Sequence, residues 1–175
     1  MDDKQLADRI ADLAVLHGDF TLRSGRKSSY YVDKYRFETQ PDVLAAIGER
    51  FGKLAVDLSV DRIVGPELGG VALAAAASIS CGKPFVLIRN AKKGYGTGNR
   101  YEGPLEEGER VLIVEDILTT GGQVIEAAKV LAEEGCQVAA IAAVIDRAEG
   151  ARDNIEAEGH ELHTLFTVAD LGVKA

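Results

Sequence analysis

Hydrophobic positions follow a helical period near the N-terminus and then a short alternating pattern. Residues 4–16 carry leucine and isoleucine at helical spacing, which predicts an amphipathic helix. Two short apolar and aromatic segments, 20–22 and 29–35, flank a polar turn and predict a two-stranded β-ribbon. A second helix is predicted over residues 41–58. This region is therefore expected to be a small helix-and-ribbon unit.

From residue 62 onward, short apolar runs alternate with helical patterns. The runs lie at 62–64, 85–88, 111–114, 138–145 and 162–166. The helical patterns between them lie at about 70–80, 122–134 and 150–158. Alternating β and α units predict an α/β fold, with a central parallel sheet covered by helices on both faces. No repeat or linker interrupts the pattern, so one domain over residues 1–175 is expected.

Composition narrows the range of functions. The chain is 46% hydrophobic with a formal charge of −8, which argues against general nucleic-acid binding. Neither a leader-like N-terminus nor a membrane-spanning apolar run is present, and a cytoplasmic location is expected. Cys81 and Cys136 could form a disulfide or redox pair, but buried apolar roles are favoured. A negatively charged body repels anions, so any phosphate site needs local basic groups.

The stretch 111–123 carries the strongest chemical signal. Glu115 and Asp116 close an apolar run, and a turn of threonine and glycine then leads into a helix near Gln123. Such a turn presents backbone N–H groups at the positive end of the helix dipole, which suits a phosphate. Acidic residues bind ribose hydroxyls in dinucleotide-binding folds, and the acid pair suits the same task. A P-loop is excluded, because the lysine that should follow the last glycine is absent. The alternative for this stretch is an ordinary strand–turn–helix without a ligand.

This stretch resembles the motif that binds phosphoribosyl pyrophosphate (PRPP) in type I phosphoribosyltransferases. Four further segments resemble the orotate branch of that family, in the same order along the chain: 20–28, 64–70, the basic loop from Arg89, and 146–150. The resemblance covers nearly the whole chain and implies the type I fold, with residues 1–40 forming a hood over the base site. It implies Mg²⁺-dependent transfer of 5-phosphoribosyl from PRPP to orotate, giving orotidine 5′-monophosphate and pyrophosphate in pyrimidine (UMP) biosynthesis. It also implies a homodimer that shares the loop 89–101 between subunits.

The same resemblance implies the residues that bind PRPP. They are Arg89, Lys93, Glu115, Asp116, Ile117, Leu118, Thr119, Thr120, Gly121, Gly122 and Gln123. Arg89 and Lys93 are also the expected catalytic residues, because a basic loop can neutralise departing pyrophosphate and exclude water. The alternative for this loop is an ordinary solvated surface segment. Magnesium is expected to bind mainly to substrate oxygens, and no side chain is assigned as its ligand.

Arg147, Thr119 and Arg23 are the candidates for orotate binding by resemblance. A planar guanidinium can bind a carboxylate through two hydrogen bonds, and orotate differs from uracil by its carboxylate. The alternative for Arg147 is a surface ion pair with Glu149. Tyr30 and Tyr31 of the predicted ribbon could pack on the base, although aromatic residues of a ribbon more often belong to a core.

Several of these candidates share one place in the predicted fold. Gly65, Arg89, Glu115 and Arg147 are each expected just beyond the C-terminal end of a predicted strand. In a parallel sheet these ends converge on one rim, where open α/β folds bind ligands. The glycine-rich turn 65–70 is a second candidate anion cradle, which the resemblance assigns to pyrophosphate.

Two other functions remain open on these residues. One is a phosphoribosyltransferase for a different base, against which Arg147 argues, because purines have no carboxylate to meet it. The other is a PRPP-sensing transcription regulator. The residues before Val64 contain no clear helix-turn-helix and no basic recognition face, which argues against a regulator.

Overall fold

A largely parallel sheet forms the centre of the molecule. The computed structural model describes residues 1–21, 25, 27–90 and 100–173. The strand order is β5 (Tyr101–Glu102), β4 (Phe85–Ile88), β3 (Arg62–Pro66), β6 (Arg110–Leu118), β7 (Gln137–Asp146) and β8 (Leu162–Thr167). Every neighbouring pair is parallel except β4 and β5. The predicted α/β fold with a central parallel sheet is confirmed. The antiparallel edge strand β5 was not predicted, because a two-residue strand leaves no periodic signal.

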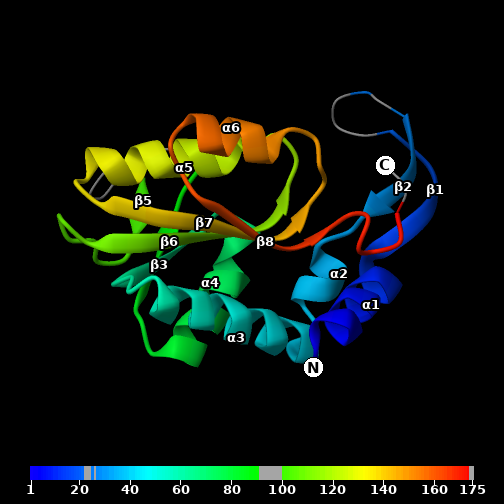
Figure 1. The fold of residues 1–175 in the computed structure, drawn as a ribbon, viewed down its shortest axis with the longest axis horizontal. Helices are drawn as coiled ribbons and strands as arrows, with labels where there is room; N and C mark the ends of the chain where they lie inside the picture. The colour runs from blue at the N-terminus through cyan, green and yellow to red at the C-terminus, as the bar shows by residue number, and fades with distance from the viewer. Residues whose placement is uncertain (22–24, 26, 91–99, 174–175) are drawn as a thin grey trace.

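Helices cover both faces of the sheet (Figure 1). One face carries α3 (Pro41–Asp57) and α4 (Gly70–Cys81), and the other carries α5 (Gly122–Glu133) and α6 (Ala151–Ala157). In β6, Leu112 and Val114 pack into the core that contains α3 and α4. Val111 and Ile113 pack into the core that contains α5 and α6. Successive side chains of a strand point to opposite faces, so a strand covered on both sides is continuously apolar.

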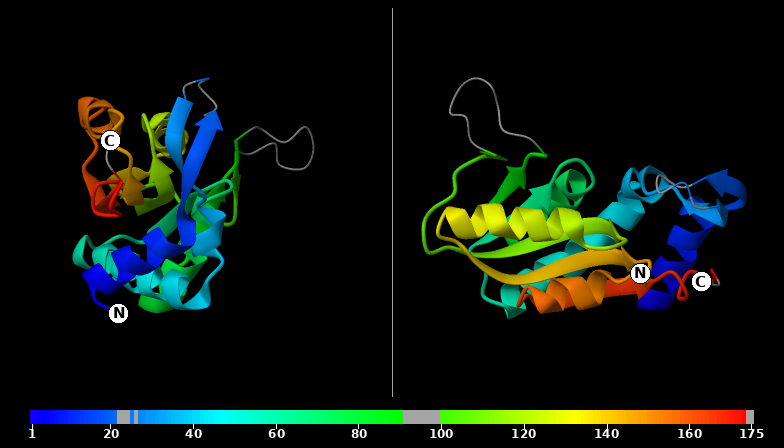
Figure 2. Two further views of the ribbon diagram at one scale, coloured as in Figure 1. Left: turned by 90° about the vertical axis from the view of Figure 1, so that its right-hand side faces the viewer. Right: turned by 90° about the horizontal axis from the view of Figure 1, so that it is seen from above.

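The N-terminal unit lies at one end of the sheet. Its elements are α1 (Asp3–Ala14), β1 (Val15–Thr21), β2 (Lys27–Val32) and α2 (Tyr35–Glu38). Figure 2 shows the β1–β2 ribbon standing apart from the main sheet. The first helix ends earlier than predicted, because Val15 is extended and pairs with Val32. The short helix α2 was not predicted, since four residues are too few to show a helical period.

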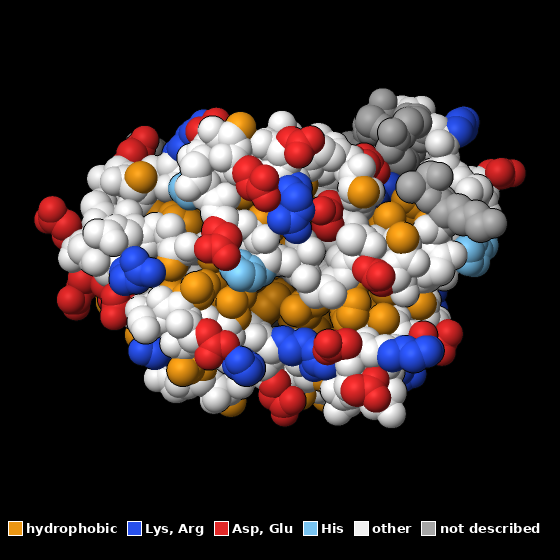
Figure 3. All heavy atoms as spheres, in the orientation of Figure 1, with side chains coloured by type: hydrophobic (Ala, Val, Ile, Leu, Met, Phe, Trp, Pro, Cys, Tyr) orange, Lys and Arg blue, Asp and Glu red, His pale blue; other side chains and the backbone are white. Residues whose placement is uncertain are grey.

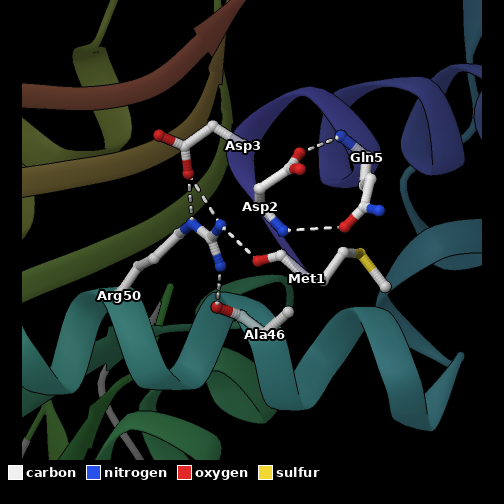
Figure 4. A network of polar contacts seen from close by, with 6 residues as sticks. All are labelled: Met1, Asp2, Asp3, Gln5, Ala46 and Arg50. Carbon is white, nitrogen blue, oxygen red and sulfur yellow. Dashed lines mark hydrogen bonds and ion pairs between the residues drawn. The ribbon is translucent and has the colours of Figure 1, made fainter.

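Polar contacts fix α1 against α3 (Figure 4). The Asp2 side chain accepts a hydrogen bond from the Gln5 backbone N–H (2.8 Å), and the Gln5 side chain accepts one from the Asp2 N–H (3.0 Å). This reciprocal cap satisfies N–H groups that the first turn leaves free. Arg50 of α3 donates to the Asp3 carboxylate (2.7 Å) and to the Met1 carbonyl (3.0 Å). The position of α1 is therefore set by directional bonds as well as by apolar packing.

Both cysteines are free in the structure. Cys136 is buried, and burial raises the pKa of its thiol, whereas Cys81 is partly exposed. The predicted role as buried apolar residues is thus confirmed for Cys136 and only in part for Cys81.

Acidic and basic side chains alternate over the surface in Figure 3. The basic side chains on this face are separated by acidic ones, so they form no continuous positive field among the residues drawn. Within the described ranges, no helix has both the length and the apolar character required to cross a bilayer.

Candidate active site

A pocket opens where β6 ends and α5 begins. Its lining consists of residues 115–124 together with Lys34, which precedes α2. The contiguous stretch 115–123, predicted to bind PRPP, therefore lines a single pocket. Lys34 reaches this pocket from a position 82 residues before Asp116.

The acid pair lies inside a strand and not just beyond its end. We expected Glu115 and Asp116 to close the apolar run, but β6 continues to Leu118. The strand continues because its pairing with β7 extends to Leu118 opposite Asp146. Both acids are consequently buried, with exposed fractions of 4% for Glu115 and 2% for Asp116. Gly65 likewise lies within β3, which ends at Pro66.

Hydrogen bonds hold the two acids in fixed orientations. Glu115 accepts a bond from the backbone N–H of Asp116 through Oε1 (3.0 Å), and its Oε2 is buried without a partner among the described residues. Asp116 accepts from the Ile117 N–H through Oδ1 and from Lys34 Nζ through Oδ2 (2.5 Å). One carboxyl oxygen of this buried pair thus still lacks the hydrogen bond that burial normally demands.

A third buried acid, Glu38 of α2, lies beside Asp116. Burial and the charge of Asp116 raise the pKa of Glu115 to about 8 and the pKa of Glu38 to about 9. Burial lowers the pKa of Lys34, but the hydrogen bond and charge of Asp116 outweigh it and raise that pKa overall. At neutral pH, Glu115 and Glu38 are therefore protonated, and Lys34 balances Asp116. A protonated carboxyl both donates and accepts hydrogen bonds, and it does not repel a nearby phosphate.

The threonine–glycine turn depends on the backbone conformation of Gly121. This residue precedes α5 with a φ of +79°, in the left-handed region that favours glycine. A Cβ on Gly121 would lie 3.0 Å from Ile155 Cγ1. Asn154 Nδ2 donates to the Thr120 carbonyl (2.9 Å), which fixes the turn to α6. The first N–H groups of α5 consequently face a defined position, and the exposed side chains of Thr119 and Thr120 flank it.

The turn after β3 packs directly against the acid pair. A Cβ on Gly69 would lie 1.4 Å from Asp116 Oδ2, so no side chain fits there in this arrangement. The Glu67 carbonyl accepts from Gln123 Nε2 (2.5 Å) and from Asn90 Nδ2 (3.3 Å). The peptide between Glu67 and the next residue is cis. Gln123 thus uses its side chain to join the turns after β3 and β6.

Arg89 follows β4 directly, at the same rim of the sheet. Its Nη1 lies 3.3 Å from Glu102 Oε1 and 3.7 Å from Glu67 Oε1. It is not among the described residues that line the pocket. Lys93, the other predicted catalytic residue, lies outside the described residues, as does the rest of 91–99.

Arg147 lies immediately after β7 and contacts the N-terminal ribbon. Its guanidinium carbon is 5.6 Å from the centre of the Tyr30 ring, within the range of a cation–π contact. The ion pair with Glu149 is also present (Nη2 to Oε1, 3.0 Å), but the Arg147 side chain is only 12% exposed. Arg147 is therefore mostly buried between the sheet and the ribbon. Of the other orotate candidates, Thr119 lines the pocket, and Arg23 lies outside the described residues.

Sequence reasoning missed Lys34 and Glu38. They are four residues apart, a spacing typical of a solvated ion pair on a helix. In the structure Glu38 is 3% exposed, and Lys34 faces Asp116. No local signal marks this contact, because it joins distant parts of the chain.

The chain is also similar to known proteins. Residues 35–160 match the phosphoribosyl transferase domain. An orotate phosphoribosyltransferase of Thermococcus gammatolerans is 42% identical over 171 residues, which cover 97% of this chain and 90% of the relative. That of Methanocella arvoryzae is 47% identical over 158 residues, or 90% of each chain.

A solved structure extends the similarity to three dimensions. The Mycobacterium tuberculosis H37Rv orotate phosphoribosyltransferase, crystallised with 5-phospho-α-D-ribosyl 1-diphosphate (PRPP), matches with a TM-score of 0.85 and 34% identity. The match covers 99% of this chain and 100% of that one. The domain match, the two relatives and this structure together show that the chain belongs to the orotate phosphoribosyltransferase family.

Proposed function

We propose that the protein transfers the 5-phosphoribosyl group of PRPP to orotate, which yields orotidine 5′-monophosphate and pyrophosphate for pyrimidine (UMP) biosynthesis. The bond from ribose C1 to the pyrophosphate oxygen breaks, and a nitrogen of orotate forms the new bond with inversion at C1. The observation that carries this proposal is the pocket of residues 115–124, where a buried acid pair adjoins a threonine–glycine turn at a helix N-terminus.

The turn after β6 would hold the 5-phosphate of PRPP. Thr119, Thr120, Gly121 and Gly122 line the pocket at the N-terminus of α5. Backbone N–H groups and the helix dipole both favour an anion there. Side-chain hydroxyls of the two threonines add further donors. The binding is therefore led by the backbone and needs no lysine in the turn.

The acid pair would hold the ribose hydroxyls. Glu115 is protonated at neutral pH because burial raises its pKa to about 8, and it can donate to one hydroxyl as well as accept from another. Its unpartnered Oε2 supports a ligand at this position. Asp116 would be the second contact, with its orientation fixed by Lys34 and by its own strand.

Orotate would lie between the sheet and the hood of residues 1–40. Arg147 and Tyr30 make a cation–π contact there, and we assign the orotate carboxylate to the Arg147 guanidinium, with Thr119 and Arg23 as further contacts. The buried Nε of Arg147 has no hydrogen-bond partner among the described residues, which supports an anionic ligand at this position. In this assignment residues 1–175 act as one domain, because the hood supplies part of the base site.

Catalysis in this proposal comes from positioning and charge stabilisation, and no side chain acts as a nucleophile. Arg89 and Lys93 would stabilise negative charge on the departing pyrophosphate. Magnesium would neutralise the leaving group, bound mainly through pyrophosphate and ribose oxygens.

A homodimer and a cytoplasmic location complete the proposal. Helix α4 is apolar around its whole circumference, and such a helix is normally buried on all sides. Its outer face nevertheless lines an apolar groove with α3, and Ile79 in this groove is 85% exposed. We assign this groove to a second copy of the chain, with the loop 89–101 shared between subunits. Light scattering that gives the mass of one chain would contradict the assignment.

The decisive experiment follows the loss of orotate absorbance with PRPP and Mg²⁺. We expect turnover with orotate and none with adenine or uracil. Arg147→Met should raise the KM for orotate on the order of 10- to 100-fold, because it removes a charge-assisted pair. Arg152→Met is the matched control, since Arg152 also pairs with a glutamate (3.2 Å) but on the exposed surface. Turnover with another base and none with orotate would contradict the proposal.

A further inference from the structure

The pocket proposed for PRPP has very little positive charge of its own. Among the described residues that line it, Lys34 is the one basic side chain, and two lining residues are acids. PRPP carries a 5-phosphate and a pyrophosphate, so its binding requires compensating charge close to the sugar. The position of Lys34 therefore bears directly on how such a ligand is held.

Lys34 Nζ lies beside both the Asp116 carboxylate and the turn after β3. It is 2.5 Å from Asp116 Oδ2, and the position of a Cβ on Gly69 would be 2.9 Å from it. The Asp116 carboxylate and the Lys34 ammonium thus both occupy the space that a side chain on Gly69 would need. Its side chain is 32% exposed, so a ligand in the pocket can reach it.

The Lys34 ammonium has N–H donors that Asp116 does not use. An ammonium carries three N–H donors, and Asp116 accepts one of them through a single hydrogen bond. The Tyr35 ring, 5.3 Å from Nζ, provides a further contact on the hood side. Glu38 is protonated at neutral pH, since burial and Asp116 raise its pKa to about 9, and does not compete strongly for the charge of Lys34. The charge of Lys34 therefore remains available to a ligand as well as to Asp116.

The arrangement of the two turns gives the side of the ligand that Lys34 would meet. The 5-phosphate is assigned to the turn after β6, on one side of the acid pair. Lys34 lines the same pocket, where it lies beside Asp116 and next to Gly69 of the turn after β3. With the 5-phosphate on the turn after β6 and the ribose hydroxyls on the acids, the C1 end of the sugar and its pyrophosphate would extend toward the turn after β3 and Lys34.

We propose that Lys34 is a PRPP-binding residue that contacts the pyrophosphate group and at the same time fixes the Asp116 carboxylate for the ribose hydroxyls. This inference rests on the proposed function. In this inference the hood supplies a cation to the site, next to Gly69, which has no side chain to provide one. The hood therefore contributes to the sugar-phosphate half of the site as well as to the base half.

The test combines titration calorimetry with pyrophosphate and Mg²⁺, and steady-state kinetics. Lys34→Met should weaken pyrophosphate binding and raise the KM for PRPP on the order of 10- to 100-fold, because it removes a charged hydrogen bond. The KM for orotate should stay unchanged, and Lys34→Arg should restore most of the affinity. Lys53→Met is the matched control, because Lys53 makes an ion pair of the same 2.5 Å length with Asp57 on the exposed surface.

Wild-type affinity for pyrophosphate in Lys34→Met would overturn the inference. If that variant does not fold, Lys34→Gln replaces it, since glutamine keeps a hydrogen-bond donor for Asp116 without the charge. A folded Lys34→Gln variant with reduced pyrophosphate affinity supports the inference, and one with wild-type affinity overturns it. Absence of orotate turnover in the wild type would instead contradict the proposed function, because the pyrophosphate titration does not depend on orotate.

Discussion

The turns after β3 and β6 both end in a pair of glycines, but they differ in what surrounds them. Each connects a parallel strand to a helix through glycine, at Gly69 before α4 and at Gly121 before α5. The turn after β6 borders an open pocket. The turn after β3 is packed, with the Glu67 carbonyl accepting two side-chain hydrogen bonds and Gly69 against Asp116.

The two glycines are required for different physical reasons. Gly69 has a φ of −66°, which any residue adopts, so only the lack of space excludes a side chain. Gly121 has a φ of +79°, which is strained for any residue with a Cβ. One glycine thus provides room for an acid and a lysine, and the other provides a backbone conformation. Similar glycine-containing turns can therefore fail in different ways when they are substituted.

Gly69→Ala should have the largest effect. The new Cβ would lie 1.4 Å from Asp116 Oδ2, so the carboxylate and its partner Lys34 must move. We expect kcat/KM for PRPP to fall on the order of 1000-fold, because misplacement of about 1 Å at a catalytic site costs roughly 100-fold and a charged contact is lost as well. Steady-state kinetics at varied PRPP measure this. A variant with wild-type kcat/KM would show that the acid pair need not occupy its observed position.

Gly121→Ala should have a smaller effect, on the fold itself. A positive φ costs a residue with a Cβ about 1–2 kcal/mol, and contact with Ile155 at 3.0 Å adds to this. Urea denaturation should show a loss of that size in the free energy of unfolding. Gly122→Ala is the matched control, because its nearest contact would be Thr120 Oγ1 at 3.9 Å, and it should change stability by less than about 0.5 kcal/mol. Equal losses in the two variants would contradict the conformational role of Gly121.

The smallest expected effect is on the pH dependence of stability, and it comes from the buried carboxyl of Glu38. Burial and Asp116 raise the pKa of Glu38 from 4.5 to about 9, so the folded protein keeps a proton that the unfolded chain releases above pH 4.5. The contribution of Glu38 to stability is therefore fully present below pH 4.5 and is lost as pH rises toward 9. Between pH 6 and pH 7 the wild type should lose about 1 kcal/mol more than Glu38→Gln, which cannot ionise. Denaturation at the two pH values measures the difference, and parallel losses would mean that Glu38 is ionised throughout.

Features encoded within one short segment were predictable. The five long strands of the sheet and the stretch 115–123 all came from local patterns, since an apolar run or a glycine-rich turn contains its own signal. The end of β6 was misplaced, because its pairing with β7 carries the strand through both acids. Local polarity alone does not reveal how far a neighbouring strand extends.

Features that depend on two distant segments were not predictable. Lys34 meets Asp116 across 82 positions, and nothing near either residue indicates the other. The cation–π contact of Arg147 with Tyr30 depends in the same way on where the ribbon lies. Glu38 has the spacing of a surface ion pair with Lys34, but the packing of α2 buries it. Tertiary packing overrides local preference at each of these positions.

The contact between Arg147 and Tyr30 has a consequence for how base preference can diverge among related enzymes. The sugar-phosphate pocket is encoded largely in one uninterrupted stretch, residues 115–124. The proposed base site is instead composite, with one face from the ribbon and one from the end of β7. If the proposed base site is correct, substitutions in the ribbon would change the contacts to the acceptor base and leave the stretch 115–124 unchanged. The separation is incomplete, because Lys34, which the hood also supplies, lines the sugar-phosphate pocket together with residues 115–124.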